Sequence, residues 1–208
     1  IAETYFRAQD YFNNINFVAC ADINLDAAKK TAEQYNIAAL SVDEIFNDKN
    51  VDIILNLTIP QAHYEISKRA LEANKHVYCE KPMSVKFDDA KELLNLAKKN
   101  SLYIGNAPDT FLGGGGQLTR NLIDNNDIGQ VLTGNFIFAF PGVQDFHPSP
   151  ESWFQEGGGP VIDMGPYFFT TLVNLLGPVK NIRGRGAKFS DKREYKAGPK
   201  KGETFNVE

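Results

Sequence analysis

The chain has 208 residues, of which 42% are hydrophobic and 23% charged, with a net charge of -4 at pH 7. This composition is ordinary for a soluble globular protein, and the net charge gives no indication of binding to nucleic acid or to an anionic membrane surface. No apolar run approaches the roughly 20 residues of a membrane span, and no signal-peptide pattern is present. We therefore expect a cytoplasmic protein without a membrane partner.

The first half of the chain alternates between short apolar runs and helical patterns. Helices are expected at residues 2–12, 25–35, 42–46, 63–73 and 87–100, and strands at 17–21, 37–40, 51–57, 76–79 and 102–104. Ser41 is the expected N-cap of the third helix. Strands that alternate with helices predict a doubly wound parallel sheet. The two cysteines, Cys20 and Cys79, fall in expected buried strands, which predicts inert thiols rather than a disulfide.

The pattern changes near Gly105, so we expect one domain at residues 1–105 and another at 106–208. In the second domain, helices are expected at 118–125 and 166–176, and strands at 131–140 and 179–188, with another strand starting at the end. The partial alternation in 131–140 is typical of an open mixed or antiparallel sheet. The chain starts without methionine in an expected helix and ends in an expected strand, so we expect both domains to be incomplete.

Polar side chains follow both strands of the central βαβ unit. Thr58 and His63 come after the first strand, and Glu80 and Lys81 come after the second. In an open α/β sheet, ligands bind at the carboxyl ends of the strands. A lysine partly shielded there is suited to proton exchange or to stabilising a developing alkoxide. Lys81 is therefore a candidate catalytic group, although composition alone would make this segment a surface turn.

Asp22 ends the strand expected at 17–21. In dinucleotide-binding folds, a carboxylate at this place accepts hydrogen bonds from the adenosine ribose hydroxyls. Asp22 would repel a 2′-phosphate, so NAD is favoured over NADP. The alternative is an aspartate in a turn that caps the next helix. The usual glycine fingerprint is absent, and Ile1-Ala2 would be its last two positions if the chain is truncated.

Three segments together resemble the Gfo/Idh/MocA oxidoreductases: Thr58-Ile59-Pro60-Gln61-Ala62-His63, residues 70–77, and Glu80-Lys81-Pro82. The resemblance runs to about Val179. It implies a Rossmann domain that binds NAD or NADP, then an α/β domain with an open sheet through which copies often pair. It also implies hydride transfer at a hydroxyl-bearing carbon of a sugar or cyclitol. In that family Lys81 would be the catalytic lysine and Asp22 the ribose-binding acid, with Thr58, Pro60, His63 and Glu80 lining the cofactor.

A second matching segment spans residues 157–167 and contains a glycine run, Asp163 and Tyr167. In the family, the aspartate and a histidine four residues later face the substrate, and the histidine is the usual proton acceptor. This chain has Tyr167 at that place. Either Tyr167 acts as general acid or base beside the Lys81 cation, or Tyr167 only fills the pocket and Lys81 handles the proton alone. Asp163 could instead only favour a helix N-terminus electrostatically.

Four further residues are weaker candidates. By resemblance, Asn106 and Asp109 are substrate contacts, although a plain linker would explain them nearly as well. His147 and the single tryptophan, Trp153, lie in the loop before the glycines, where a histidine is more often merely solvated. No histidine and cysteine spacing suggests a metal site.

The leading hypothesis from the sequence is an NAD-dependent dehydrogenase that acts on a small polyol. One alternative is an enzyme that retains and recycles NAD during transient oxidation. Another is a non-catalytic, dinucleotide-responsive regulator. The tyrosine in place of the family histidine leaves the regulator open, and Lys81 argues against it.

Overall fold

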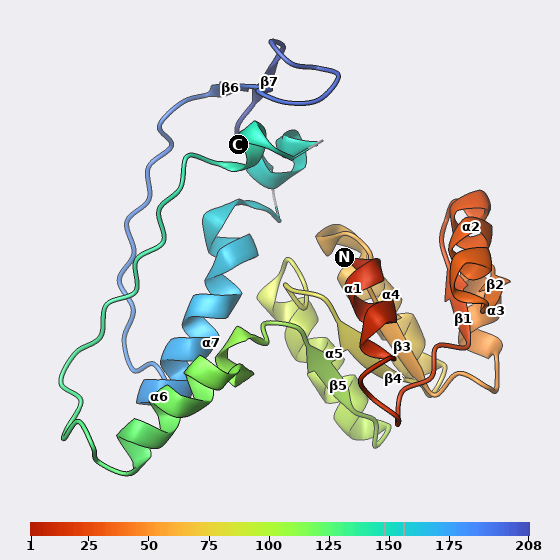
Figure 1. Ribbon diagram of the computed structural model, residues 1–208, viewed down its shortest axis with the longest axis horizontal. Coiled ribbons are helices and arrows are strands. Elements are labelled where there is room, and N and C mark those ends of the chain that lie inside the picture. The colour runs from red at the N-terminus through yellow and green to blue at the C-terminus, as the bar shows by residue number, and fades with distance from the viewer. Residues whose placement is uncertain (148, 156) are drawn as a thin grey trace. The chain divides into compact units, whose positions relative to one another are not determined.

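The computed structural model describes residues 1–147, 149–155 and 157–208. The chain divides into two compact units, Ile1–Ala107 and Pro108–Glu208, each of which is described by itself (Figure 1). Within the described ranges, the helices fall short of the combined length and hydrophobicity that a membrane crossing requires.

The first unit is an α/β unit in which all strands run parallel. Its helices are α1 (Ala2–Ala8), α2 (Leu25–Tyr35), α3 (Val42–Asn47), α4 (Pro60–Glu72) and α5 (Phe87–Lys99). Its strands are β1 (Ala19–Ala21), β2 (Ala38–Leu40), β3 (Ile53–Asn56), β4 (His76–Cys79) and β5 (Ile104–Asn106). β1 pairs with β2, and β3, β4 and β5 form a second sheet in that order. The predicted Rossmann-type parallel architecture is confirmed.

The two sheets of this unit are not paired with each other: among the described residues, β1 has a strand partner only in β2, and β3 only in β4. Ile53, at the start of β3, is 57% exposed. Side chains of α1 contact both halves. The Tyr5 ring lies 6.4 Å from the Tyr78 ring of β4, and the Phe6 ring stacks 4.1 Å from the Tyr35 ring of α2.

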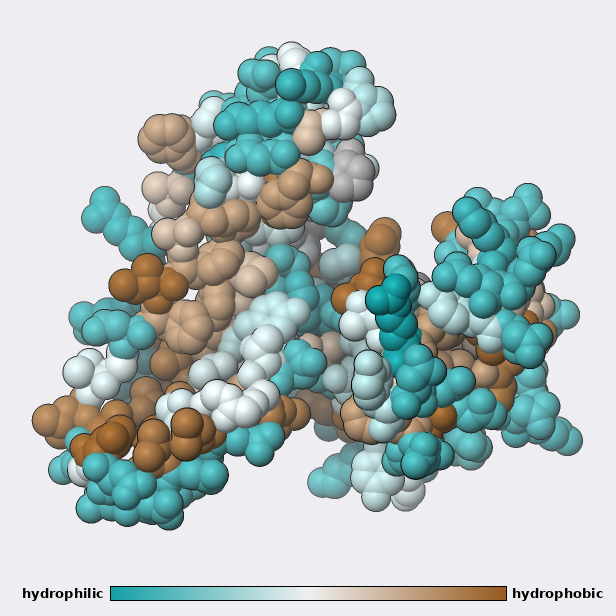
Figure 2. Space-filling model, in the orientation of Figure 1, coloured by the Kyte–Doolittle hydropathy of each residue, from teal (hydrophilic) through white to brown (hydrophobic). Residues whose placement is uncertain are grey.

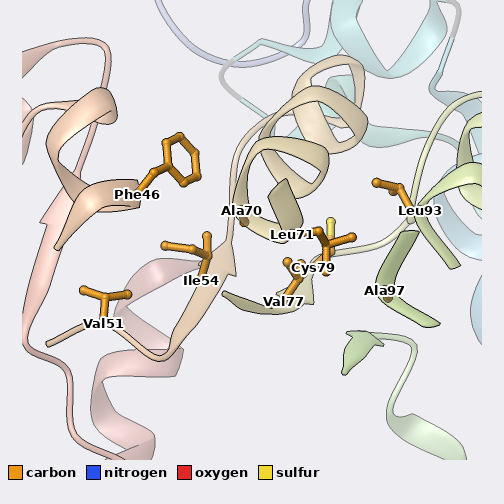
Figure 3. Close-up of a cluster of buried hydrophobic side chains, with 9 residues drawn as sticks. All are labelled: Phe46, Val51, Ile54, Ala70, Leu71, Val77, Cys79, Leu93 and Ala97. Atoms are coloured by element: carbon orange, nitrogen blue, oxygen red, sulfur yellow. The ribbon is translucent and has the colours of Figure 1, made fainter. Parts of the chain in front are cut away.

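The core of the first unit is built by β3, β4 and the helices α3, α4 and α5 (Figure 3). Its buried side chains are Phe46, Val51, Ile54, Ala70, Leu71, Val77, Cys79, Leu93 and Ala97. Leu71 and Leu93 are 0% exposed, and burying a leucine stabilises a fold by about 1.5–3 kcal/mol. Burial also raises the pKa of the Cys79 thiol to about 12. Both cysteines are free, as predicted, and Cys79 stays protonated and unreactive at neutral pH.

Capping side chains set the helix boundaries. The Asn24 side chain accepts hydrogen bonds from the backbone N–H groups of Asp26 and Ala27 at the start of α2. Ser41 and Glu44 form a capping box at the start of α3, which confirms the predicted N-cap. The hydrogen bonds from Ser41 lower the pKa of the Glu44 carboxyl.

Some boundaries differ from the prediction. The helix expected at residues 63–73 begins at Pro60. Proline is favoured at this position because N–H groups in the first helical turn have no acceptor within the helix, so its lack of an N–H costs no hydrogen bond. The helix expected at 2–12 ends at Ala8. The strand expected at 102–104 lies at Ile104–Asn106, where its residues pair with β4.

Helices and short helical turns make up most of the regular secondary structure of the second unit. It contains α6 (Gly114–Asp124), α7 (Gly165–Leu176), short 3₁₀ turns η1 (Thr110–Leu112), η2 (Val143–Asp145) and η3 (Pro150–Phe154), and a π-helical turn η4 (Pro160–Met164). β6 (Lys192–Glu194) and β7 (Thr204–Asn206) pair antiparallel. The Arg120 guanidinium of α6 donates to the carbonyl oxygens of Asn174 and Leu175 at 2.8 and 2.9 Å, which holds α6 against the end of α7.

The strands predicted at residues 131–140 and 179–188 are wrong. Both segments run as extended chain without a strand assignment (Figure 1). Apolar side chains in them point to solvent, with Leu132 and Ile137 each 85% exposed and Ile182 80% exposed. The alternation of apolar residues favours a strand, but a strand also needs a neighbour to pair its backbone donors and acceptors. Among the described residues of this unit, antiparallel pairing is confined to β6 and β7.

A series of eight aromatic rings runs through the second unit. Successive ring centroids lie 4.3, 5.1, 4.9, 5.7, 5.0, 5.5 and 4.8 Å apart. In this order the rings belong to Phe136, Phe168, Phe138, Phe140, Trp153, Phe154, Phe205 and Tyr195. Edge-on and tilted ring pairs add about 0.5–1.5 kcal/mol each beyond area burial. The rings connect α7, η3 and the β6–β7 pair.

Candidate functional site

The carboxyl ends of three strands lie in register at one edge of the first unit. Asn56 of β3 pairs with Cys79 of β4, and Cys79 pairs with Asn106 of β5. The loops that follow these strands therefore leave the sheet side by side. This is the edge at which an open α/β sheet binds ligands, and it carries Thr58, Glu80 and Lys81.

The side chain of Asn56 organises the loop after β3. Its amide nitrogen donates to the carbonyl oxygen of His63 and to the hydroxyl of Ser67, both at 3.0 Å. Its amide oxygen accepts from the backbone N–H and the hydroxyl of Thr58, at 3.2 and 2.7 Å. Asn56 is only 1% exposed. The sequence analysis missed this residue, although a lone amide in an apolar strand was the available signal.

His63, predicted to line a cofactor, lies beneath the loops and is 1% exposed. One ring nitrogen, Nδ1, lies 2.6 Å from the carbonyl oxygen of Pro82, and the other, Nε2, lies 2.9 Å from that of Thr58. The imidazole thus joins the loop after β3 to the loop after β4. Contact of His63 with a cofactor stays a prediction.

The backbone beside Lys81 is fixed by three side chains. The Glu80 carboxylate accepts a hydrogen bond from the Tyr5 hydroxyl at 2.8 Å and from the backbone N–H of Lys81 at 3.1 Å. The Asn106 amide nitrogen donates to the carbonyl oxygens of Cys79 and Glu80 at 2.9 and 3.0 Å. Lys81 itself is half-buried and precedes a cis peptide bond to Pro82. No sequence pattern indicated a role for Tyr5, and Asn106 was predicted only as a substrate contact.

Asp22 lies exposed directly after β1. Its Oδ1 accepts a hydrogen bond from the backbone N–H of Asn24 at 2.8 Å. The helix-capping role that was the alternative for Asp22 belongs to Asn24. An exposed carboxylate at the carboxyl end of a parallel strand is suited to accept hydrogen bonds from ribose hydroxyls. Asp22 also contributes, after burial, to raising the pKa of the Cys20 thiol.

Asp163 and Tyr167 belong to adjacent helical turns of the second unit. Asp163 lies in η4 and Tyr167 in the first turn of α7, and both are half-buried. The Oδ2 atom of Asp163 accepts a hydrogen bond from the indole N–H of Trp153 at 2.9 Å. The carbonyl oxygen of Tyr167 accepts from the Thr171 hydroxyl at 2.7 Å. The sequence analysis named Asp163 and Trp153 separately and missed their contact.

The remaining candidates lie at the surface. Asp109 is exposed and precedes η1. His147 is exposed, and its Nδ1 accepts a hydrogen bond from the backbone N–H of Ser149 at 3.1 Å. Outside positions 148 and 156, no group of three or more His, Cys, Asp or Glu side chains is arranged to hold a metal ion.

A cavity of about 530 Å³ lies in the second unit beside η3. Its walls combine aromatic, glycine and basic residues, among them Phe140, Trp153, Gly159, Lys188 and Arg193. Trp153 therefore lines this cavity, and its indole N–H donates to Asp163.

Two family models match the chain. The first, described as an oxidoreductase family with an NAD-binding Rossmann fold, matches residues 1–106. The second, the GFO/IDH/MocA C-terminal domain, matches residues 117–204.

Curated relatives and solved structures are also similar to this chain. D-xylose dehydrogenase of Paenarthrobacter nicotinovorans is 27% identical over 177 residues, which are 82% of this chain and 46% of the relative. Inositol 2-dehydrogenase of Salmonella paratyphi B is 31% identical over 132 residues, which are 61% of this chain and 39% of the relative. The chain thus spans less than half the length of these relatives. An NAD binding oxidoreductase from Klebsiella pneumoniae has a similar fold, with a TM-score of 0.78 at 22% identity, over 100% of this chain and 56% of that one.

Proposed function

Because the chain belongs to the Gfo/Idh/MocA oxidoreductase family, we propose that it acts as an NAD-dependent dehydrogenase. The reaction is hydride transfer between the cofactor and a hydroxyl-bearing carbon of a sugar, cyclitol or related polyol. The observation that carries this proposal is Lys81, which is held at the carboxyl end of β4 by the bonds of Glu80 and Asn106. Relatives named for D-xylose and inositol support the substrate class.

The residues at the strand ends fit parts of a dinucleotide. Asp22 presents an exposed carboxylate after β1 for the adenosine ribose, and its negative charge favours NAD over NADP. Thr58 and Glu80 lie on the loops after β3 and β4, and Pro60 begins α4, where the nicotinamide end would be held. A glycine fingerprint for the pyrophosphate does not occur in residues 1–107, whose single glycine is Gly105.

Each candidate residue has a proposed role. When bound, the nicotinamide supplies the hydride acceptor. Lys81 donates a hydrogen bond to the reacting oxygen, and either Lys81 or Tyr167 exchanges its proton. Asp163 and Tyr167 contact hydroxyl groups of the substrate, and Asn106 and Asp109 are secondary candidates for such contacts.

A panel of polyols tests the proposed function directly. Pentoses, hexoses and inositols are added singly to the purified chain with NAD, and NADH formation is followed by absorbance. We expect turnover of at least one polyol, with NAD preferred over NADP because of Asp22. Binding of NADH without turnover of any substrate would instead favour a dinucleotide-responsive regulator, and absence of NADH binding would overturn the proposal.

We also propose that the protein is cytoplasmic and forms a homo-oligomer through the second unit. Apolar side chains gather on the surface of this unit over α6, α7 and the extended segments (Figure 2). Exposed apolar residues there are Leu118, Leu122, Leu132, Ile137, Phe169, Val173, Leu176, Val179 and Ile182. Exposed apolar patches of this kind mark interaction surfaces. Light scattering after size exclusion should give a mass of at least twice 23.1 kDa, and a strictly monomeric chain would contradict this proposal.

A further inference from the structure

One side-chain hydrogen bond connects two turns that flank the glycine run of the second unit. The indole N–H of Trp153, in η3, donates to Oδ2 of Asp163, in η4, at 2.9 Å. The indole nitrogen is only a donor, and hydrogen bonds to a charged acceptor are about twice as strong as neutral ones. Both residues are half-buried, so water competes less for this bond than at an open surface.

Packing fixes the orientation of the indole ring. Trp153 lies edge-on between two phenyl rings, 5.7 Å from that of Phe140 and 5.0 Å from that of Phe154. Both phenyl rings pack against the indole ring, and the N–H edge of the indole bonds to the Asp163 carboxylate. The indole is therefore a rigid donor rather than a freely rotating one.

The glycine run brings the chain close to η3. A Cβ on Gly158 would lie 2.6 Å from the backbone oxygen of Trp153 and 2.9 Å from that of Ser152, closer than real contacts. Gly157 and Gly159 have positive φ angles of 87° and 79°, which side chains rarely allow. The backbone thus doubles back against Trp153 before it enters η4.

We propose that Trp153 is a positioning residue for Asp163, holding its carboxylate in one rotamer where it meets a hydroxyl group of the substrate. This inference rests on the proposed function, because it concerns the substrate contact made by Asp163. This role requires a side chain that carries an N–H donor at the edge of a rigid ring. Phenylalanine keeps one aromatic ring and removes the five-membered ring of the indole together with that donor.

The test compares Trp153→Phe with Phe205→Leu in the full chain. Trp153→Phe should lower kcat roughly 10- to 100-fold, the scale of misplacing a reacting contact, with the KM for NAD unchanged. Phe205→Leu removes a buried ring that packs on Phe154 and Tyr195 but keeps the donor and both rings beside it, so it should lower the unfolding midpoint without that loss in kcat. In an Asp163→Asn background, Trp153→Phe should have little further effect. Equal losses in both backgrounds, or an unchanged kcat in the single variant, would overturn the inference.

Fluorescence separates this inference from the proposed function. Trp153 is the single tryptophan of the chain, so its emission reports on one site. Asp163→Leu, which removes the acceptor, should shift the emission maximum, whereas Asp127→Leu, at an exposed carboxylate that is not part of the cavity wall beside Trp153, should not. If Asp163→Leu shifts the emission but the unmodified chain turns over no polyol, the contact between Trp153 and Asp163 is supported and the proposed function is rejected. Identical emission in all three proteins would reject the contact.

Discussion

Replacing Lys81 with alanine is expected to lower turnover by about 10²- to 10⁴-fold, the range that a positioned acid or base contributes. Lys81 is half-buried at the end of β4, and its backbone is fixed through Glu80 and Asn106. Truncation at Cβ leaves these backbone bonds in place, so NADH binding should persist. Steady-state rates on the best polyol and NADH titration by fluorescence measure the two quantities separately.

The matched control is Lys86→Ala. Lys86 is an exposed lysine that precedes α5, and its removal changes the net charge equally. We expect turnover within about twofold of the unmodified chain, because an exposed side chain at a helix start usually contributes little. Near-normal turnover of Lys81→Ala would remove this lysine from the mechanism. Equal losses in both lysine variants would point to a general effect of charge.

Lys81→Arg and Tyr167→Phe decide which group exchanges the proton. Arginine keeps the positive charge but does not release a proton at neutral pH. If Lys81 exchanges the proton, turnover of Lys81→Arg should therefore stay far below that of the unmodified chain. If Tyr167 is the acid or base, Tyr167→Phe should lower turnover about as much as Lys81→Ala. If Tyr167 only fills the pocket, turnover of Tyr167→Phe should stay near normal. The sequence left these two interpretations open, and kcat of the two variants separates them.

Asn56→Leu is expected to produce the largest loss of stability, about 3 kcal/mol or more. The leucine has a similar size, but it leaves the N–H of Thr58, the hydroxyl of Ser67 and the carbonyl of His63 without this partner. Ser67 is 0% exposed, so water cannot replace the bond there. Each buried group left unpaired costs about 1–3 kcal/mol. For a chain of this size the midpoint of thermal unfolding should fall by roughly 6–12 °C.

Asn47→Leu makes the same substitution at a surface position. Asn47 is exposed and donates one hydrogen bond to the carbonyl oxygen of Asp43, at 2.9 Å. Its replacement should change the free energy of unfolding by less than about 0.5 kcal/mol, as is usual at the surface. Denaturant unfolding followed by circular dichroism compares the two variants. Similar midpoints for both would show that the Asn56 contacts contribute little.

Much of the first unit was predictable because its signals are local. The helix spacing of apolar residues, the Ser41 cap and the apolar run before Asn56 all lie within a few residues of the element they specify. The predicted strand at 76–79 matches β4. Boundaries were less certain, as Pro60 shows, since a proline can either precede a helix or open it.

The second unit shows why the rest could not be predicted. The segment 131–140 has the alternation of a strand, yet a strand depends on a partner that the local sequence does not specify, and Leu132 and Ile137 remain exposed. α6 begins in the glycine run, at Gly114, where helix propensity is low.

The candidate site shows the same division. The positions of Asp22, Glu80 and Lys81 directly after strands could be predicted from the sequence. The contacts of Tyr5 with Glu80 and of Trp153 with Asp163 join residues that are distant in the sequence or lie in different turns. Only the folded chain reveals such pairs.

The two separate sheets of the first unit have a consequence for cooperativity. No backbone ladder joins the β1–β2 pair to the β3–β4–β5 sheet among the described residues, so their coupling relies on side chains. Tyr5 and Phe6 of α1 contact both parts, and α3 adds the Phe46 ring beneath the Arg69 guanidinium of α4. Because segments with few buried contacts open first, we expect the amides of β1, which directly precedes Asp22, and of its partner β2 to exchange hydrogen faster than those of β3 and β4.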